Sequence, residues 1–422
     1  MQERIRKVVK HPLISGSTII FVGTFLANII NYLFNLLMGR MLSVADYGLL
    51  SSLSSLFILS AIFAIAFGNV ITRFIATYHG SGNKKGEQAV LLIGTKYVAI
   101  FSTLILFILI LFSPLIGKFL HVTNNIFVIL IAFSSFFTLM LSLPAGFIQG
   151  KMRFLFLSAI TIVQPILKLI VAVILLLLGY SILSPFIGIL VGGALPTLLL
   201  YYYLFRNLVK KQQLESFDEQ SFKKEFIHSS YTFFLSGIGI TILQNTDIML
   251  VRHFFGPYES GLYAALSLMG KAIFYFTSPI NAVFFPLIAF RKERKQRLFH
   301  VVVLAFGLIA GLSTAISFVY FAIPEVIIKI FFPSSSYQEV GRYLGFFSLY
   351  ILAFSLVFLF NNFYLSIGRR GVYKATLFAA LLQVILILFI HQSIFHIIAI
   401  LFSISLLLLI SFLIYYFLYE KD

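Results

Sequence analysis

The chain has 422 residues, of which 60% are hydrophobic and 11% are charged, whereas a soluble domain has about 45–50% apolar and about 25% charged residues. A mean hydropathy of +1.03 excludes a water-soluble globule, because so much apolar surface does not fit inside one or two cores. Lys and Arg outnumber Asp and Glu by 31 to 14. Membrane proteins collect such an excess in cytoplasmic loops, so we expect no nucleic-acid partner. Cysteine is absent, which excludes disulfides, thiol catalysis and Cys-ligated zinc.

Twelve apolar runs are each long enough to cross a bilayer, which takes about 20 helical residues. We therefore predict an all-α polytopic membrane protein with about twelve transmembrane helices. Their approximate limits are 12–38, 47–71, 88–112, 125–148, 154–178, 182–205, 230–252, 261–289, 299–323, 341–366, 374–391 and 394–418. The even number places both termini on the same side of the membrane.

The basic residues indicate which side that is. With the N-terminus in the cytoplasm, 23 Lys and Arg fall in inner segments and only five in outer ones, namely Arg40, Lys118, Arg252, Lys329 and Arg342. This asymmetry predicts cytoplasmic N- and C-termini. The outer loops are short, and no Walker loop, GxSxG, HExxH or paired-carboxylate motif appears. We therefore expect no enzyme, no metal and no cofactor.

The two halves of the chain resemble each other at a shift of about 213 residues. Ser17, Phe21, Asp46, Gly48 and Leu49 fall on Ser230, Phe234, Glu259, Gly261 and Leu262. This repeat predicts an N-terminal six-helix bundle in 1–205, a cytoplasmic linker in 206–229 and a C-terminal six-helix bundle in 230–422, related by an axis along the membrane normal. The alternative is a chance likeness between hydrophobic helices.

Three ionisable side chains are predicted near the middle of the bilayer. At about 1.5 Å per residue, Lys168, Asp247 and Lys271 each lie roughly 15–21 Å from the outer loops. A charge at this depth is costly, so it faces a cavity or a partner by default and marks a pathway. The alternatives are snorkelling for the two lysines and, for Asp247, an internal ion pair that fixes helix packing.

The first predicted helix carries a stripe of amide side chains. The spacings of three and four between Asn28, Asn31 and Asn35 place all three on one helical face. The repeat places Thr241 and Gln244 on the matching face of the seventh helix. In lipid, such a stripe meets either another helix, through interhelical hydrogen bonds, or a water-filled cleft.

One segment resembles a known family. Gly39-Arg40-Met41-Leu42-Ser43-Val44-Ala45-Asp46-Tyr47-Gly48-Leu49, after the Asn-bearing helix, is similar to the segment that opens bacterial polysaccharide flippases. These are the Wzx-like polysaccharide-transporter branch of the MOP exporter superfamily, of O-antigen, teichoic acid or capsule type. The counterpart in the second half, Asp247-Ile248-Met249-Leu250 followed by Gly261-Leu262-Tyr263-Ala264-Ala265, resembles the same family. The likeness covers essentially the whole chain.

The resemblance implies two six-helix bundles that form a V around a central cavity, which opens alternately to the two sides of a bacterial or archaeal plasma membrane. The implied cargo is an undecaprenyl-pyrophosphate-linked glycan, moved to the outer leaflet for cell-surface polysaccharide biosynthesis. Implied partners are the lipid bilayer and a glycan polymerase or glycosyltransferases of the same pathway. The alternatives are a cation-coupled small-molecule exporter of the MATE type and a lipid II-type flippase, which usually carries two further helices.

Under this resemblance the polar residues take candidate roles. A pyrophosphate carries about two negative charges, for which cationic side chains are the natural ligands. The predicted substrate-binding residues are Lys168 and Lys271, with Arg73 near the inner mouth, Arg40 and Arg252 near the outer mouth, and Asn28, Asn31, Asn35 and Gln244 for sugar hydroxyls. The predicted ion-coupling or gating residues are Asp247, Asp46 and Glu259.

Overall fold

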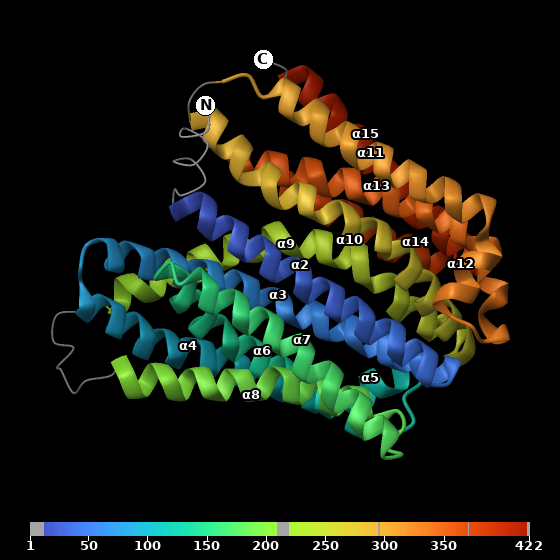
Figure 1. Cartoon of the computed structure of the whole chain (residues 1–422), viewed down its shortest axis with the longest axis horizontal. Coiled ribbons are helices and arrows are strands. Elements are labelled where there is room, and N and C mark those ends of the chain that lie inside the picture. The colour runs from blue at the N-terminus through green and yellow to red at the C-terminus, as the bar shows by residue number, and fades with distance from the viewer. Residues whose placement is uncertain (1–11, 209–218, 294–295, 370, 420–422) are drawn as a thin grey trace. The chain divides into compact units, whose positions relative to one another are not determined.

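The computed structural model describes residues 12–208, 219–293, 296–369 and 371–419, and all regular secondary structure in these ranges is helical (Figure 1). The helices are α2 (Pro12–Met41), α3 (Val44–Gly80), α4 (Lys84–Leu111), α5 (Ser113–Phe119), α6 (Ile126–Gly150), α7 (Phe154–Leu177), α8 (Leu183–Leu208), α9 (Glu219–Phe255), α10 (Pro257–Glu293), α11 (Phe299–Ala322), α12 (Pro324–Phe331), the 3-10 helix η1 (Ser335–Val340), α13 (Gly341–Ser366), α14 (Val372–Phe389) and α15 (Ile394–Tyr419). Each of the twelve predicted spans coincides with one long helix, which confirms the all-α fold.

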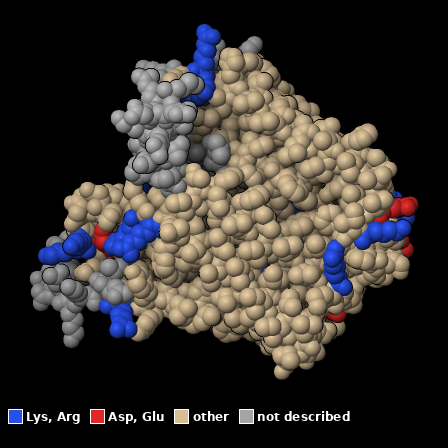
Figure 2. Space-filling view, in the orientation of Figure 1, with Lys and Arg blue, Asp and Glu red and all other residues tan. Residues whose placement is uncertain are grey.

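The lengths and compositions of these helices identify a multi-pass membrane protein. Among the described residues, ten helices are long and apolar enough to cross a membrane. The other two predicted spans lie in α9 and α10, which have 37 residues each and carry Asp247 and Lys271. On the face shown in Figure 2, Lys, Arg, Asp and Glu side chains are few, and most of the described surface belongs to other residues. Such a surface suits contact with lipid.

The helices group into two compact units. Unit 1 comprises residues 1–34 and 56–235, and unit 2 comprises residues 35–55 and 236–422. The boundaries between the units fall inside α2, α3 and α9, so each of these helices begins in one unit and ends in the other. The bundle limits that the repeat predicts stay a prediction.

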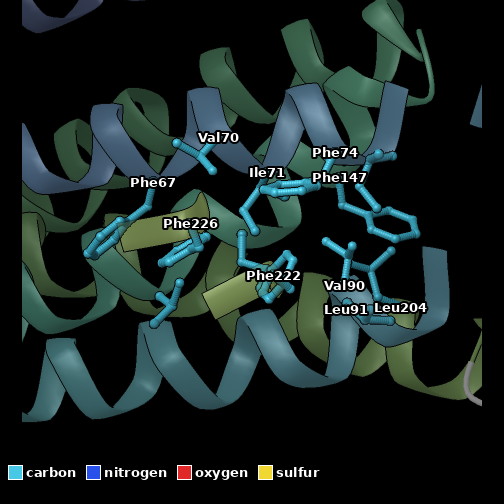
Figure 3. Packing of buried hydrophobic residues seen from close by; sticks show 13 residues of the cluster. Phe67, Val70, Ile71, Phe74, Val90, Leu91, Phe147, Leu204, Phe222 and Phe226 are labelled. Carbon is cyan, nitrogen blue, oxygen red and sulfur yellow. The ribbon is translucent and has the colours of Figure 1, made fainter. Parts of the chain in front are cut away.

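A cluster of buried aromatic and aliphatic side chains joins the helices of unit 1 (Figure 3). Its 13 members, from α3, α4, α6, α8 and α9, are Phe67, Val70, Ile71, Phe74, Ile75, Val90, Leu91, Val98, Leu143, Phe147, Leu204, Phe222 and Phe226. The ring centroids of Phe226 and Phe67 are 5.4 Å apart, and those of Phe222 and Phe74 are 4.8 Å apart. The end of the segment predicted as a linker is therefore the start of α9, and it is packed into the core of unit 1.

Glycines allow two pairs of helices to approach closely. In unit 1, a Cβ on Gly188 of α8 would lie 2.6 Å from the backbone oxygen of Lys168 on α7. A Cβ on Gly192, one turn later, would lie 2.9 Å from the Cβ of Lys168. Small residues four apart are the usual means by which membrane helices pack against each other. The contact holds Lys168 at a defined position against α8.

The start of α10 packs against the start of α3 in unit 2. The two helices begin at Val44 and Pro257, the same 213-residue shift that the repeat predicts. Gly256, with φ of +92°, ends α9, and the fixed φ of Pro257 suits the first turn of α10. A Cβ on Gly261 would lie 1.8 Å from the backbone oxygen of Val44, and one on its repeat partner Gly48 would lie 2.6 Å from the Gly261 nitrogen.

We expect Gly188→Ala to lower the free energy of unfolding by about 1–3 kcal/mol, because the added methyl group overlaps the backbone of α7. The matched control is Gly307→Ala in α11, where a Cβ meets no atom within 4 Å and alanine favours the helix. Thermal unfolding of the two purified variants in detergent, followed by size-exclusion chromatography, measures the difference. Equal melting temperatures for Gly188→Ala and Gly307→Ala would contradict the close packing.

Candidate functional site

Lys168 of α7 faces α2 within unit 1. Its Nζ donates a hydrogen bond to Oδ1 of Asn31 at 2.5 Å and lies 4.1 Å from the centroid of the Phe34 ring. This is a charge-assisted hydrogen bond combined with a cation–π contact. The sequence predicts both Lys168 and Asn31 as site residues, and the structure adds that they contact each other. Phe34 is absent from the prediction, although its spacing of three from Asn31 places it on the same helical face.

These contacts use only some of the hydrogen-bond donors of the Lys168 ammonium. An ammonium has three N–H donors, and within the described residues Asn31 accepts a hydrogen bond from one of them. The side chain is half-buried, on a helix that has no other charged residue. The arrangement therefore presents a cation that is oriented by α2 and retains donors for an anionic ligand.

Asp247 of α9 is fully buried in unit 2. Its Oδ2 accepts a hydrogen bond of 2.8 Å from the Tyr263 hydroxyl on α10, whereas its Oδ1 has no hydrogen-bond partner in the part of the chain that the structure describes. The ammonium of Lys271, 8% exposed on α10, attracts this carboxylate through space. A buried carboxylate with one unsatisfied oxygen is costly to maintain, and such groups are typical of functional sites.

A second layer of polar contacts fixes α9 one turn before Asp247. The backbone oxygen of Leu243 accepts hydrogen bonds from the Tyr350 hydroxyl of α13 and from Nε2 of Gln383 of α14, both at 3.2 Å. The sequence does not predict a role for Tyr263, Tyr350 or Gln383 in this site. All three come from helices other than α9, so no spacing along one helix could reveal them.

A cavity of about 170 Å³ lies beside Tyr263 in unit 2. Among its lining residues are Glu259 and Tyr263 of α10, Glu339 of η1 and Arg342 of α13. Tyr263 therefore contacts this cavity and also donates its hydroxyl to buried Asp247. The structure thus places two of the predicted coupling residues, Glu259 and Asp247, near the same tyrosine.

The two arginines predicted at the outer mouth make structural contacts in unit 2. Arg40 donates from Nε to the oxygen of Phe331 at 2.7 Å and from Nη2 to the oxygen of Ile330 at 2.5 Å. It thereby caps the C-terminal carbonyls of α12. Arg252, 3% exposed, donates from Nη1 to the oxygen of Ala45 and to Oγ of Ser260, both at 3.1 Å. These contacts connect the end of α9 to the starts of α3 and α10, and a role in substrate binding stays a prediction for both residues.

The remaining predicted residues also lie at helix contacts or on half-buried faces. Nη2 of Arg73 donates to Oγ of Ser229 at 3.2 Å in unit 1. Oδ2 of Asp46 accepts a hydrogen bond from Oγ of Ser43 at 2.7 Å, and the Asp46 N–H donates to the same Oγ at 3.1 Å, which is a capping arrangement at the start of α3. Three predicted amide residues, in addition to Asn31, are half-buried: Asn28, Asn35 and Gln244.

The candidate site therefore consists of two clusters, each defined within its own unit. The lysine cluster is Lys168, Asn31 and Phe34 in unit 1, and the aspartate cluster is Asp247, Tyr263 and Lys271 in unit 2. That both clusters face one central cavity stays a prediction.

We expect a double-mutant cycle on Lys168 and Asn31 to show a coupling energy of about 1 kcal/mol, because either substitution removes the same charge-assisted hydrogen bond. Melting temperatures of Lys168→Ala, Asn31→Ala and the double variant in detergent provide the measurement. A parallel cycle between Lys168→Ala and Asn28→Ala is the control, with additive effects expected. Additive effects in the first cycle would show that the Lys168–Asn31 contact contributes nothing to stability.

Comparison with known families and relatives gives two sequence matches. The family model described as polysaccharide biosynthesis protein matches residues 13–291 of the chain. An uncharacterized membrane protein of Methanocaldococcus jannaschii, MJ1375, is 28% identical over 156 residues, which are 35% of this chain and 38% of that relative. The match thus spans less than half of that relative's length.

Solved structures with a similar fold include transporters of the MOP superfamily. The inward-facing conformation of a multidrug resistance MATE family transporter of this superfamily aligns with a TM-score of 0.73 at 13% identity, over 92% of each chain. A MOP superfamily transporter from Pyrococcus furiosus, whose binding pocket is described as having a reverse polarity that suggests a different function, aligns with a TM-score of 0.68 at 14% identity, over 95% of this chain and 94% of that one. At these identities the likeness establishes the fold.

Proposed function

The chain belongs to the family of polysaccharide biosynthesis proteins, and on that premise we propose that it is a flippase for a polyprenyl-pyrophosphate-linked oligosaccharide. It moves this cargo, of which an undecaprenyl-linked glycan is the expected form, from the cytoplasmic to the outer leaflet of a bacterial or archaeal plasma membrane by alternating access. The fold shared with MOP-superfamily transporters supports transport over catalysis. The observation that carries the proposal is the lysine cluster.

The chemistry of Lys168 suits a pyrophosphate headgroup. The ammonium is oriented by Asn31 and Phe34 and keeps N–H donors for phosphate oxygens. In a site shielded from water, each charge-assisted hydrogen bond to a phosphate is stronger than a neutral one. The half-buried amide side chains of Asn28, Asn35 and Gln244 are of the type that binds sugar hydroxyls.

The membrane potential favours this direction of transport. With a negative cell interior, moving one negative charge outward is favoured by about 2.3 kcal/mol per 100 mV, and a pyrophosphate with two charges by about 4.6 kcal/mol. The potential therefore contributes a driving force even without a coupled ion.

The aspartate cluster supports a second role, in ion coupling. Buried Asp247 has one unsatisfied oxygen, and Tyr263, whose hydroxyl donates to its other oxygen, also lines the 170 Å³ cavity. Ionisable groups at this depth in a membrane protein are typical of proton and cation pathways. The same observation favours the alternative function, a cation-coupled exporter of small molecules, in which Asp247 is the main site and Lys168 has no substrate role. A lipid II-type flippase is a further alternative that uses the same headgroup chemistry.

We expect the double variant Lys168→Ala with Lys271→Ala to reduce glycan export about 100-fold or more, because each of the two lost charge-assisted hydrogen bonds contributes about 1.5–3 kcal/mol. Accumulation of lipid-linked sugar on the cytoplasmic side of the producing cell provides the measurement. Lys96→Ala, which removes a lysine from α4, is the control and leaves export unchanged. Normal surface glycan in cells whose transporter lacks both Lys168 and Lys271 would overturn the pyrophosphate site.

We expect Asp247→Asn to remove the dependence of transport on proton or sodium gradients, because the amide cannot change its charge. Tyr263→Phe keeps the Asp247 carboxylate, so we expect this variant to retain the gradient dependence and to slow transport less than Asp247→Asn does. Export by right-side-out vesicles, measured with and without imposed gradients, compares these variants with Glu325→Gln in the first turn of α12, a control outside the cluster. An Asp247→Asn protein that keeps full gradient dependence shows that coupling occurs elsewhere.

A further inference from the structure

A larger cavity, of about 630 Å³, lies in unit 2, and no residue of the lysine cluster or the aspartate cluster lines it. It is formed where α13 ends, α14 begins and the last turns of α15 pass, and we call it the α14 cavity. Its lining includes Tyr364 of α13, Phe412 and Tyr415 of α15, and Arg369 in the turn between α13 and α14. None of the residues assigned a role in transport lines it.

Two glycines between α13 and α14, Gly368 and Gly371, line this cavity. Gly368, with φ of +79°, ends α13, and the N–H groups of Gly368 and Arg369 donate to the oxygens of Leu365 and Tyr364 at 3.1 and 2.8 Å. This is a Schellman cap, which places Arg369 directly after the left-handed residue. A Cβ on Gly368 or on Gly371, the residue before α14, would meet no atom within 4 Å. The described side chains therefore leave the space beside both glycines unfilled.

The cavity has an aromatic wall and a basic rim. The centroid of the Tyr364 ring lies 5.4 Å from that of Phe412 and 5.3 Å from that of Tyr415, so the rings pack together, and Tyr415 is the most exposed of the three. At the rim lie exposed Arg369 and the N-terminal end of α14, where the N–H groups of Val372 and Lys374 donate to the oxygens of Arg369 and Gly371 and the helix dipole favours a negative charge. An aromatic wall beside a cationic rim is complementary to an amphiphile with an anionic head.

We propose that the α14 cavity binds a phospholipid with an anionic headgroup. The phosphate lies beside Arg369 and the start of α14. The part of the acyl chains nearest the headgroup contacts Tyr364, Phe412 and Tyr415. The predicted topology places this end of unit 2 on the cytoplasmic side, where anionic lipids attract basic residues and where basic pockets between membrane helices bind their headgroups. The site shares no residue with the lysine cluster, so the proposal does not depend on the identity of the cargo.

The test uses the full chain, purified and delipidated in detergent, with phosphatidylglycerol or phosphatidylcholine added. We expect phosphatidylglycerol to raise the melting temperature and phosphatidylcholine to have little effect. Arg369→Gln raises the phosphatidylglycerol concentration needed for half of this stabilisation by about tenfold, the loss of one charge-assisted contact. Native mass spectrometry of the same samples counts the bound lipids, with one fewer expected in the variant.

Arg153→Gln is the matched control. Arg153 follows Met152, which has φ of +55°, and its N–H donates to the oxygen of Ile148, so it occupies the same position of the same cap in unit 1. This variant keeps the wild-type response to phosphatidylglycerol.

A second pair of variants fills the cavity instead of changing its charge. Gly371→Leu is compatible with the backbone at φ of −61° and abolishes the response, and Ala375→Leu, also on the lining, gives the same readout if the first variant does not fold. Equal stabilisation of the wild type by both lipids, or a full response in Arg369→Gln or in a folded cavity-filling variant, overturns the proposal.

Discussion

The cost of placing a charged or polar side chain in hydrocarbon organises this molecule. Lys168 is the one charged residue of α7, and the structure supplies the amide of Asn31 and the ring of Phe34 as its partners. Asp247 is held by the Tyr263 hydroxyl and attracted by Lys271. Neither cluster contains a close pair of opposite charges that satisfies it fully. A ligand or an ion of complementary charge would lower this cost, which is why both clusters are proposed as sites.

Precise helix packing maintains these partially satisfied groups. Gly188 and Gly192 bring α8 against the backbone of α7 at Lys168, and Gly48 and Gly261 bring the starts of α3 and α10 together. One turn before Asp247, the side chains of Tyr350 and Gln383 donate hydrogen bonds to the backbone oxygen of Leu243 and so hold α9 in place. In lipid there is no hydrophobic force between helices, so close van der Waals contact and interhelical hydrogen bonds supply the stability. The same contacts limit how far the site residues can move.

Several residues whose charge suggested a ligand are occupied by structural contacts. Arg40 caps α12 and Arg252 connects three helix ends in unit 2. Asp46 caps α3 through Ser43. At the ends of membrane helices, backbone groups need partners as much as ligands do, so a basic residue near a predicted mouth is weaker evidence for binding than a lysine in mid-helix. Lys168 is therefore a stronger candidate for ligand binding than Arg40 or Arg252, because no helix end near it in the described part of the chain needs its donors.

The sequence by itself determined the class, the spans and the repeat. The apolar composition indicates a membrane protein, and runs of about 20 apolar residues indicate membrane-spanning helices. The shift of 213 residues predicts that α3 and α10 begin at equivalent positions, Val44 and Pro257. It also predicted Lys168 and Asp247 as site residues, because charge in an apolar run is visible without coordinates. Only the tertiary structure decided their partners, which are Asn31 and Phe34 from α2 for Lys168 and Tyr263 from α10 for Asp247. It alone also brought together the rings that line the α14 cavity. Periodicity shows which face of a helix a residue occupies, but contacts between helices depend on packing between segments that are distant in the chain.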